Sequence, residues 1–249
     1  KGHQTKQRVK QKPIVTTRPN ELVQVDYEKL SVAVDGYIGF MLIIDHYTKW
    51  GRAIPMKGFT AKNAALALHF SWGLIFGSPE QIQSDQGSQF EAAIFQEYTQ
   101  LIGSKKIRST AYHPQTNGLV ERHNRTVVSM LKVVCSKYQK DWPDHLDKAV
   151  FAYNCSIHES TKFTPNRLWL GREVVTPIWW MFPEYMDKTE MTVSEFAKKH
   201  LLNMADIMKL CRGNQHAAQV RQKRNHDKKI RGEHEYKVGN LVMVFLHVV

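Results

Sequence analysis

Residues 38–50, IGFMLIIDHYTKW, form a nearly continuous apolar run. A strand that is covered on both faces has this pattern, because neither of its faces meets water. Residues 21–30, ELVQVDYEKL, instead alternate apolar and polar side chains, which is typical of a half-buried strand. The turn signal Asp35-Gly36 lies between the two segments. We therefore predict a central strand within residues 38–50, preceded by a half-buried strand that ends near Asp26.

The segments that follow alternate between strand and helix patterns. Strands are expected at residues 51–56, 80–85 and 105–110, and helices at residues 60–77, 90–103, 117–136, 141–158 and about 193–228. In the first of these helices, Ala64, Leu68, Trp72 and Ile75 fall at helical spacing. In the third, Val120, Val127, Leu131 and Val134 are expected to form a stripe that faces the core. Three adjacent strands followed by alternating helices and strands predict an α/β fold with a mixed sheet.

The charge of the chain is concentrated in two flanks. Residues 1–18 carry six Lys or Arg and no acid, and residues 198–237 carry eleven Lys or Arg against four acids. These flanks account for the whole net charge of +12, so the 249-residue chain has a near-neutral middle. Basic arms attract polyanions, and nucleic acid is the commonest of these inside cells. Solvated flanks that bind nothing specific are the alternative.

Other features of the composition exclude some classes of protein. No run of about 18 apolar residues exists, so no membrane partner is expected. The three cysteines, Cys135, Cys155 and Cys211, are widely spaced and form no Cys-x-x-Cys pair. Neither a disulfide framework nor a zinc knuckle is therefore predicted.

Three carboxylates stand out against this background. Asp26 and Asp85 lie in or at the end of predicted strands, where acids are disfavoured, and Glu121 lies in the first turn of a predicted helix. Each has an ordinary explanation. Asp85 precedes Gln86-Gly87 and could be a turn residue, Asp26 could pair with a buried lysine, and Glu121 could favour the helix dipole.

Taken together, the three acids suggest a metal site. The strands that hold Asp26 and Asp85 are plausible neighbours in such a sheet, and a helix that carries Glu121 can pack across them. Converging carboxylates repel one another unless a cation holds them ionised. Oxygen ligands suit Mg²⁺ or Mn²⁺, and two such ions can activate an attacking oxygen and stabilise a leaving one during phosphoryl transfer.

The motifs around these acids are VDYEKL, SDQGSQF and HPQTNGLVERHNRT, together with YTKW and AYNCSIHESTKFTPNRLWLGRE. They resemble the catalytic core of retroviral-type integrases, especially those of gypsy-type LTR retrotransposons. Exactly 35 residues separate Asp85 from Glu121, the spacing of this D,D-35-E family. The resemblance covers about residues 17–175. It implies a ribonuclease-H-like five-stranded sheet flanked by helices, and a polynucleotidyl transferase that processes the 3′ ends of retroelement DNA and joins them to target DNA.

The resemblance also implies roles for individual residues. Asp26, Asp85 and Glu121 would be the catalytic ligands of two Mg²⁺ or Mn²⁺ ions. Positions that contact DNA in the family are Tyr112, Asn117, Asn124 and Arg125. Arg125 lies one turn beyond Glu121 and can contact a phosphate, whereas Tyr112 could instead pack under its own loop. No zinc is expected within the chain, because no cysteine accompanies His113 and His123.

The resemblance divides the chain into four segments. Residues 1–18 are expected to be a basic linker that follows a missing N-terminal zinc module, and residues 19–176 the catalytic core. Residues 177–236 would be a basic helical linker, and residues 237–249 the start of a truncated C-terminal β-barrel. The motif after Asp26 departs from the family, since many relatives have an aromatic residue and then Gly-Pro there.

Several functional expectations follow from the resemblance. The partners would be retroelement and target DNA, bound by a homo-oligomer, and the site of action the nucleus, after transit through the cytoplasm. A host-adopted, non-catalytic DNA-binding or scaffolding protein is the alternative function; loss of a carboxylate would favour it, and the triad is intact. A ribonuclease or another transposase would fit the carboxylates but fits the surrounding motifs poorly.

Overall fold

The computed structural model describes residues 13–108, 118–135, 140–176, 181 and 191–228. The strands are β1 (Leu22–Lys29), β2 (Gly39–Asp45), β3 (Gly51–Met56), β4 (Gln81–Ser84) and β5 (Lys105–Arg108). The helices are α1 (Ala61–Leu68), the π-helix η1 (His69–Gly73), α2 (Leu74–Phe76), α3 (Ser88–Glu91), α4 (Ala93–Leu101), α5 (Gly118–Val134), α6 (Trp142–Asn154), α7 (Pro165–Leu170) and α9 (Val193–Asp227). The chain divides into two compact units, one of residues 14–215 and one of residues 1–13 and 216–249.

The strands form one mixed sheet in the first unit. Their order is β3-β2-β1-β4-β5. β1, β2 and β3 pair antiparallel, whereas β4 lies parallel to both β1 and β5. Every residue of β2 is buried, as the apolar run in the sequence predicts. The strand lies between β3 and β1, and its side chains pack alternately into the cores on the two faces of the sheet.

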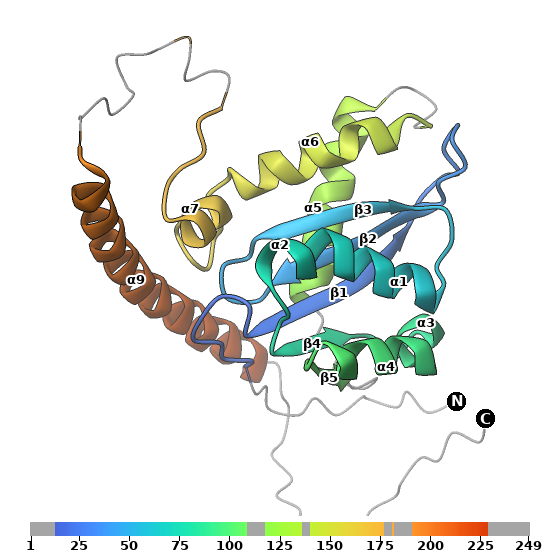
Figure 1. Ribbon diagram of the computed structural model, residues 1–249, viewed down its shortest axis with the longest axis horizontal. Helices are drawn as coiled ribbons and strands as arrows, with labels where there is room; N and C mark the ends of the chain where they lie inside the picture. Colours follow the sequence, from blue (N-terminus) through green and yellow to red (C-terminus); the bar gives the residue numbers. More distant parts are fainter. Residues whose placement is uncertain (1–12, 109–117, 136–139, 177–180, 182–190, 229–249) are drawn as a thin grey trace, which may run out of the picture. The chain divides into compact units, whose positions relative to one another are not determined.

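Helices cover both faces of this sheet. On one face α1 and α4 pack over a core that includes Val23, Val25 and Trp72. On the other face α5 and α6 pack over Phe40, Leu42 and further residues of β2. Figure 1 shows α1 in front of the sheet and α5 behind it. The predicted α/β fold, a ribonuclease-H-like mixed five-stranded sheet flanked by helices, is confirmed.

The predicted central strand is shorter than the apolar pattern. β2 ends at Asp45 because that buried carboxylate turns the chain: it accepts hydrogen bonds from the Thr48 amide at 2.6 Å, from the Thr48 hydroxyl at 2.7 Å and from the Asn20 amide at 2.9 Å. Lys49 then adopts a left-handed backbone with a φ of 68°. The sequence DHYTKW is therefore a turn that joins β2 to β3.

Two predicted helices are interrupted. Residues 60–77 form α1, η1 and α2, and the wider π turn rotates the residues beyond it. Trp72 is buried, but Ile75, which falls at the same helical spacing in the sequence, is 53% exposed. Residues 90–103 divide into α3 and α4, because Ala92 has an extended backbone with a ψ of 143°. In α5, Val134 is 52% exposed and also lies outside the core.

The first part of α9 packs on the turn after β2. Tyr47, Leu168, Ile207 and Cys211 form a small buried cluster within residues 14–215. The Tyr47 hydroxyl donates to the Met208 carbonyl at 3.2 Å, and the Gln215 side chain donates to the Tyr47 carbonyl at 2.5 Å. This segment lies in the region predicted to be a helical linker, and it is attached to the core through Tyr47.

Parts of the predicted domain plan lie outside the described residues. These are most of the N-terminal basic segment and the whole C-terminal segment 237–249, where the start of a β-barrel was expected. The four domain limits stay predictions. Among the helices that the structure does describe, none is long and apolar enough to cross a membrane.

Candidate metal and DNA site

The parallel pairing of β1 and β4 brings two of the predicted ligands to the same edge of the sheet. The last paired residues in the register are Gln24 and Gln83, whose side chains are joined by a buried hydrogen bond of 2.6 Å. Asp26 and Asp85 each follow two residues later. Because side chains alternate along a strand, each aspartate continues the face of its glutamine. This is the face that α5 covers.

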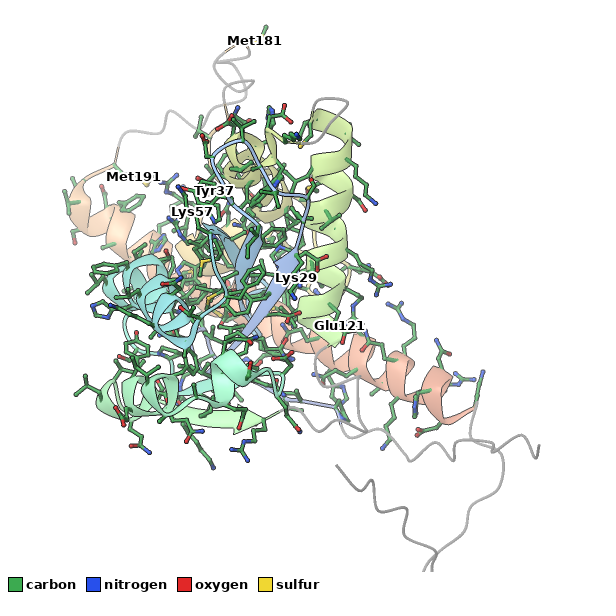
Figure 2. The ribbon with its side chains drawn as sticks, turned by 90° about the vertical axis from the view of Figure 1, so that its right-hand side faces the viewer. Lys29, Tyr37, Lys57, Glu121, Met181 and Met191 are labelled. Atoms are coloured by element: carbon green, nitrogen blue, oxygen red, sulfur yellow. The ribbon has the colours of Figure 1, made fainter. Side chains whose placement is uncertain are left out.

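Helix α5 brings the third predicted ligand and a neighbour of Asp26. Glu121 is exposed in the first turn of α5, and Figure 2 shows it at the N-terminal end of that helix. One turn further on, Asn124 is only 3% exposed, and its Nδ2 donates a hydrogen bond of 3.0 Å to Asp26 Oδ2. The other oxygen of Asp26 accepts from the Tyr27 amide at 2.9 Å.

The electrostatics of Asp26 place the three acids in one neighbourhood. Burial, together with the negative charges of Asp85, Glu28 and Glu121, raises the pKa of Asp26 to about 7 against the opposing hydrogen bond from the Tyr27 amide. A buried carboxyl with acidic neighbours is hard to ionise. A bound cation is the simplest means of keeping this group charged at neutral pH.

The three acids lie near one another but do not form a complete set of metal ligands around one point. Within the described ranges, no group of three His, Cys, Asp or Glu side chains lies in a metal-holding arrangement. The structure thus brings Asp26, Asp85 and Glu121 into electrostatic range without closing them around a point. Their chemistry still suits a divalent ion, since all are oxygen donors. Beside them, Asn124 Oδ1 is buried and has no hydrogen-bond partner among the residues that the structure describes.

The ordinary interpretations of the acids receive mixed support. Asp85 does form a turn, because its Oδ1 accepts from the Gly87 amide at 3.0 Å. Glu121 does lie in the first turn of a helix, where the macrodipole favours an acid. Asp26 bonds to Asn124, and among the described residues it forms no ion pair with a lysine, which the alternative required. A turn hydrogen bond uses one lone pair of Asp85 and leaves the carboxylate able to bind a cation.

The predicted DNA contacts are only partly described. Arg125 is exposed on α5, as a phosphate contact requires, whereas Asn124 faces the core and Asp26. Tyr112 and Asn117 lie outside the described residues, as does His113. The role of all four predicted positions in DNA binding stays a prediction.

His123, which raised the question of zinc, packs inside the protein. Its ring stacks on Tyr153 with the centroids 3.7 Å apart, and burial lowers its pKa to about 3. The uncharged ring fills space against Gly51 of β3. His123 therefore contributes to the packing of α5 on the sheet.

Two features of the site were not predicted from the sequence. They are the Asn124 bond to Asp26 and a set of charged contacts around Ser84, Glu91, Lys106 and Arg108. The glutamines two residues before the aspartates could have indicated the polar face, since Gln24 and Gln83 are polar residues at buried positions of the two strands. Nothing in the local sequence pairs Asn124 with a residue 98 positions away.

Comparisons with known proteins agree with the motifs. The Tf2-3 and Tf2-4 transposon polyproteins of Schizosaccharomyces pombe are each 27% identical to this chain over 239 residues, which cover 92% of it. The match spans only 17% of each polyprotein. No protein-family model matches the chain.

Two solved structures were also found. The HTLV-2 integrase catalytic core domain with magnesium, in its trimeric form, has a TM-score of 0.47 and 21% identity and covers 59% of this chain and 95% of that one. The dimeric form has a TM-score of 0.44 and 22% identity and covers 55% of this chain and 88% of that one.

A gypsy-type origin stays a prediction. The Tf2 match spans nearly the whole chain, the D,D-35-E motifs are intact, and Asp26 and Asp85 end neighbouring parallel strands beside the helix of Glu121. These observations agree with the resemblance to a retroviral-type integrase catalytic core.

Proposed function

We propose that the chain is the catalytic core of a retroelement integrase that removes nucleotides from the 3′ ends of element DNA and joins those ends to target DNA. The observation that carries this proposal is the half-buried Asp26, which bonds to the buried Asn124 and whose pKa is raised to about 7 by burial and by neighbouring acids that include Asp85 and Glu121. An uncompensated acidic cluster of this kind costs folding free energy. A bound divalent cation would offset that cost.

In this proposal Asp26, Asp85 and Glu121 hold Mg²⁺ or Mn²⁺. When bound, two such ions would activate the attacking oxygen and stabilise the leaving one in an in-line phosphoryl displacement. The side chains of the protein prepare that chemistry. Asn124 orients Asp26 through its 3.0 Å hydrogen bond, and the Gly87 amide orients Asp85. No covalent bond to the protein is required.

DNA would reach this site through positively charged groups. Arg125 is exposed one turn beyond Glu121 and can contact a phosphate without reading sequence. Tyr112 and Asn117 would contact the DNA end from the segment before α5. The basic flanks would add contacts that are independent of sequence. We further propose that the protein acts in the nucleus, as a homo-oligomer on DNA ends.

The test is a strand-transfer assay on the protein with its flanking domains, using matched element-end DNA and Mg²⁺. Glu121→Gln removes a ligand charge and little volume, so we expect strand transfer to be lost while the fold and most of the DNA affinity remain. Glu97→Gln, the same change at an exposed position of α4, is the matched control and should leave activity unchanged.

Two outcomes would contradict the proposal. Strand transfer by Glu121→Gln at the rate of the parent would remove Glu121 from the catalytic set. A parent protein that binds DNA but neither processes nor joins ends under any divalent ion would favour the host-adopted, non-catalytic alternative.

A further inference from the structure

Two basic side chains of β5 meet one acid of α3. Arg108 Nη2 lies 2.6 Å from Glu91 Oε2, and Lys106 Nζ lies 3.8 Å from Glu91 Oε1. Lys106 also donates a hydrogen bond of 2.5 Å to the hydroxyl of Ser84. The ammonium group of Lys106 therefore lies between Ser84 and Glu91.

Ser84 and Glu91 are the two ends of the segment that carries Asp85. Ser84 is the last residue of β4, is fully buried, and donates its own hydroxyl proton to the Asp85 carbonyl at 2.7 Å. Glu91 is the last residue of α3. Within the segment, the Gly87 amide donates to Asp85 Oδ1. Lys106 thus connects both ends of a short chain segment whose middle presents a predicted catalytic carboxylate.

The low solvent exposure of Lys106 strengthens its interaction with Glu91. Its side chain is only 12% exposed, and burial lowers its pKa while the charges of Glu91 and Asp85 oppose that shift. Glu91 Oε1 is buried and has no hydrogen-bond partner among the described residues, so the charge of Lys106 is its nearest compensation. Charges removed from water attract each other more strongly than exposed ones, and breaking such a pair leaves the partner uncompensated.

The pairing of β4 with β5 also shows on which face of the sheet the Lys106 side chain lies. Lys106 pairs with Ile82 in the β4–β5 ladder, so its side chain lies on the face of α3 and not on the face of Asp85 and α5. Lys106 therefore supports the Asp85 segment from behind and does not occupy the space where DNA or a cation would bind. Arg108, at the end of β5, holds the second oxygen of the same glutamate.

We propose that Lys106 is a positioning residue for Asp85: together with Glu91 it fixes both ends of residues 84–91 and sets where the Asp85 carboxylate lies relative to Asp26. We call the contacts of Lys106 with Ser84 and Glu91 the clamp. The catalytic consequence of the clamp rests on the proposed function, but the clamp itself is present in the protein without metal or DNA. A displacement of about 1 Å at a reacting group can cost up to about a hundredfold in rate.

The test compares Lys106→Met with Lys106→Arg. Methionine keeps much of the length and removes the charge, whereas arginine keeps a cation that can reach Ser84 and Glu91. Glu91→Gln is a second variant that breaks the clamp from the other side and leaves the Ser84 contact in place. Glu80→Gln is the matched control, because it removes the Arg18–Glu80 ion pair of 2.7 Å, which also joins distant parts of the chain but is exposed.

The first measurement is amide hydrogen exchange at Gly87 in the protein without metal or DNA. We expect exchange to be about tenfold faster in Lys106→Met and Glu91→Gln, because the hydrogen bond to Asp85 is held less firmly, and unchanged in Lys106→Arg and Glu80→Gln. The second measurement is strand transfer. We expect kcat to fall about tenfold in Lys106→Met with the KM for DNA unchanged, and Lys106→Arg to restore it.

The outcomes separate this inference from the proposed function. If Lys106→Met and Glu91→Gln both fold and their Gly87 amide exchanges at the rate of the parent, the clamp is contradicted. If Lys106→Met fails to fold, Glu91→Gln decides the question alone. Faster exchange in the variants of a protein whose parent shows no strand transfer would support the clamp and overturn the proposed function. Faster exchange with a parental kcat would overturn the catalytic role of Lys106.

Discussion

At the scale of single residues, Asp26 has an environment that is unfavourable for a charged carboxylate. It lies on the polar face of a half-buried strand, accepts a hydrogen bond from a buried asparagine, and has acidic neighbours. Its folded pKa of about 7 lies above the ordinary value of 3.8. The unfolded chain therefore releases this proton at a lower pH than the folded protein does. Between these two values, rising pH destabilises the metal-free fold, and above about 7 the loss is complete.

Asp26→Asn should remove this penalty, because an amide does not ionise. Without divalent ions, we expect the variant to gain stability relative to the parent as the pH rises from 5 to 8, by roughly 2 kcal/mol. Urea denaturation followed by circular dichroism at both pH values measures the difference. Asp35→Asn, at an exposed turn, is the control and should show no such trend. A stability difference between variant and parent that is the same at pH 5 and pH 8 would show that Asp26 has an ordinary pKa.

At the scale of elements, the position of α5 on the sheet depends on a glycine at the start of β3. A Cβ atom added to Gly51 would lie 2.0 Å from Cε1 of His123 on α5. From α6, the side chain of Asn154 accepts from the Gly51 amide at 3.0 Å and donates to the Gly51 carbonyl at 2.8 Å. One small residue thus allows both helices to approach the edge strand, and α5 is the helix that carries Glu121 and Asn124.

Gly51→Ala should therefore destabilise the protein by about 1 to 3 kcal/mol, the usual cost of overpacking a filled core. Gly213→Ala is a matched substitution in the interior of α9, where a Cβ atom would meet nothing within 4 Å. There we expect a gain of up to about 1 kcal/mol from helix propensity. Thermal or urea denaturation of both variants gives the comparison. Equal effects of the two alanines would mean that α5 can move away from β3 without cost.

At the scale of the whole molecule, charge is distributed very unevenly. The two flanks carry the entire excess of positive charge, and the part of the chain between them is close to neutral. An arrangement of this kind favours attraction to DNA through the flanks and leaves orientation to the few basic residues near the acids. The first part of α9 is fixed to the core through Tyr47 and Gln215, so at least one basic flank begins from a defined position.

Binding of duplex DNA should accordingly weaken steeply with salt. Each neutralised phosphate contributes a slope of roughly −0.9 in log K against log salt concentration. Changing Lys10 and Lys12 together to glutamine should make the slope shallower, whereas the same double change at Lys62 and Lys148, which are exposed on the core, should leave it unchanged. Fluorescence anisotropy over a salt series measures both slopes. A parental affinity that does not respond to salt would exclude the arms as phosphate binders.

Much of the fold could be predicted from local patterns. The five strands, their order along the chain and the burial of β2 follow from apolar periodicity, which reports directly on which faces meet water. The breaks could not be predicted this way. The π turn after Leu68, the extended backbone at Ala92 and the exposure of Ile75 depend on how α1 and α4 fit over the sheet. Periodicity carries no information on that fit.

The sequence by itself determined the chemistry of the candidate site: three acids, the separation of 35 residues between the last two, and basic flanks for a polyanion. These properties depend only on residue type and spacing. The tertiary structure alone decided that Asn124 faces Asp26 and that Lys106 joins Ser84 to Glu91. Such pairs join residues far apart in the chain, and only the packing of complete elements brings their polar atoms within hydrogen-bonding or ion-pairing distance.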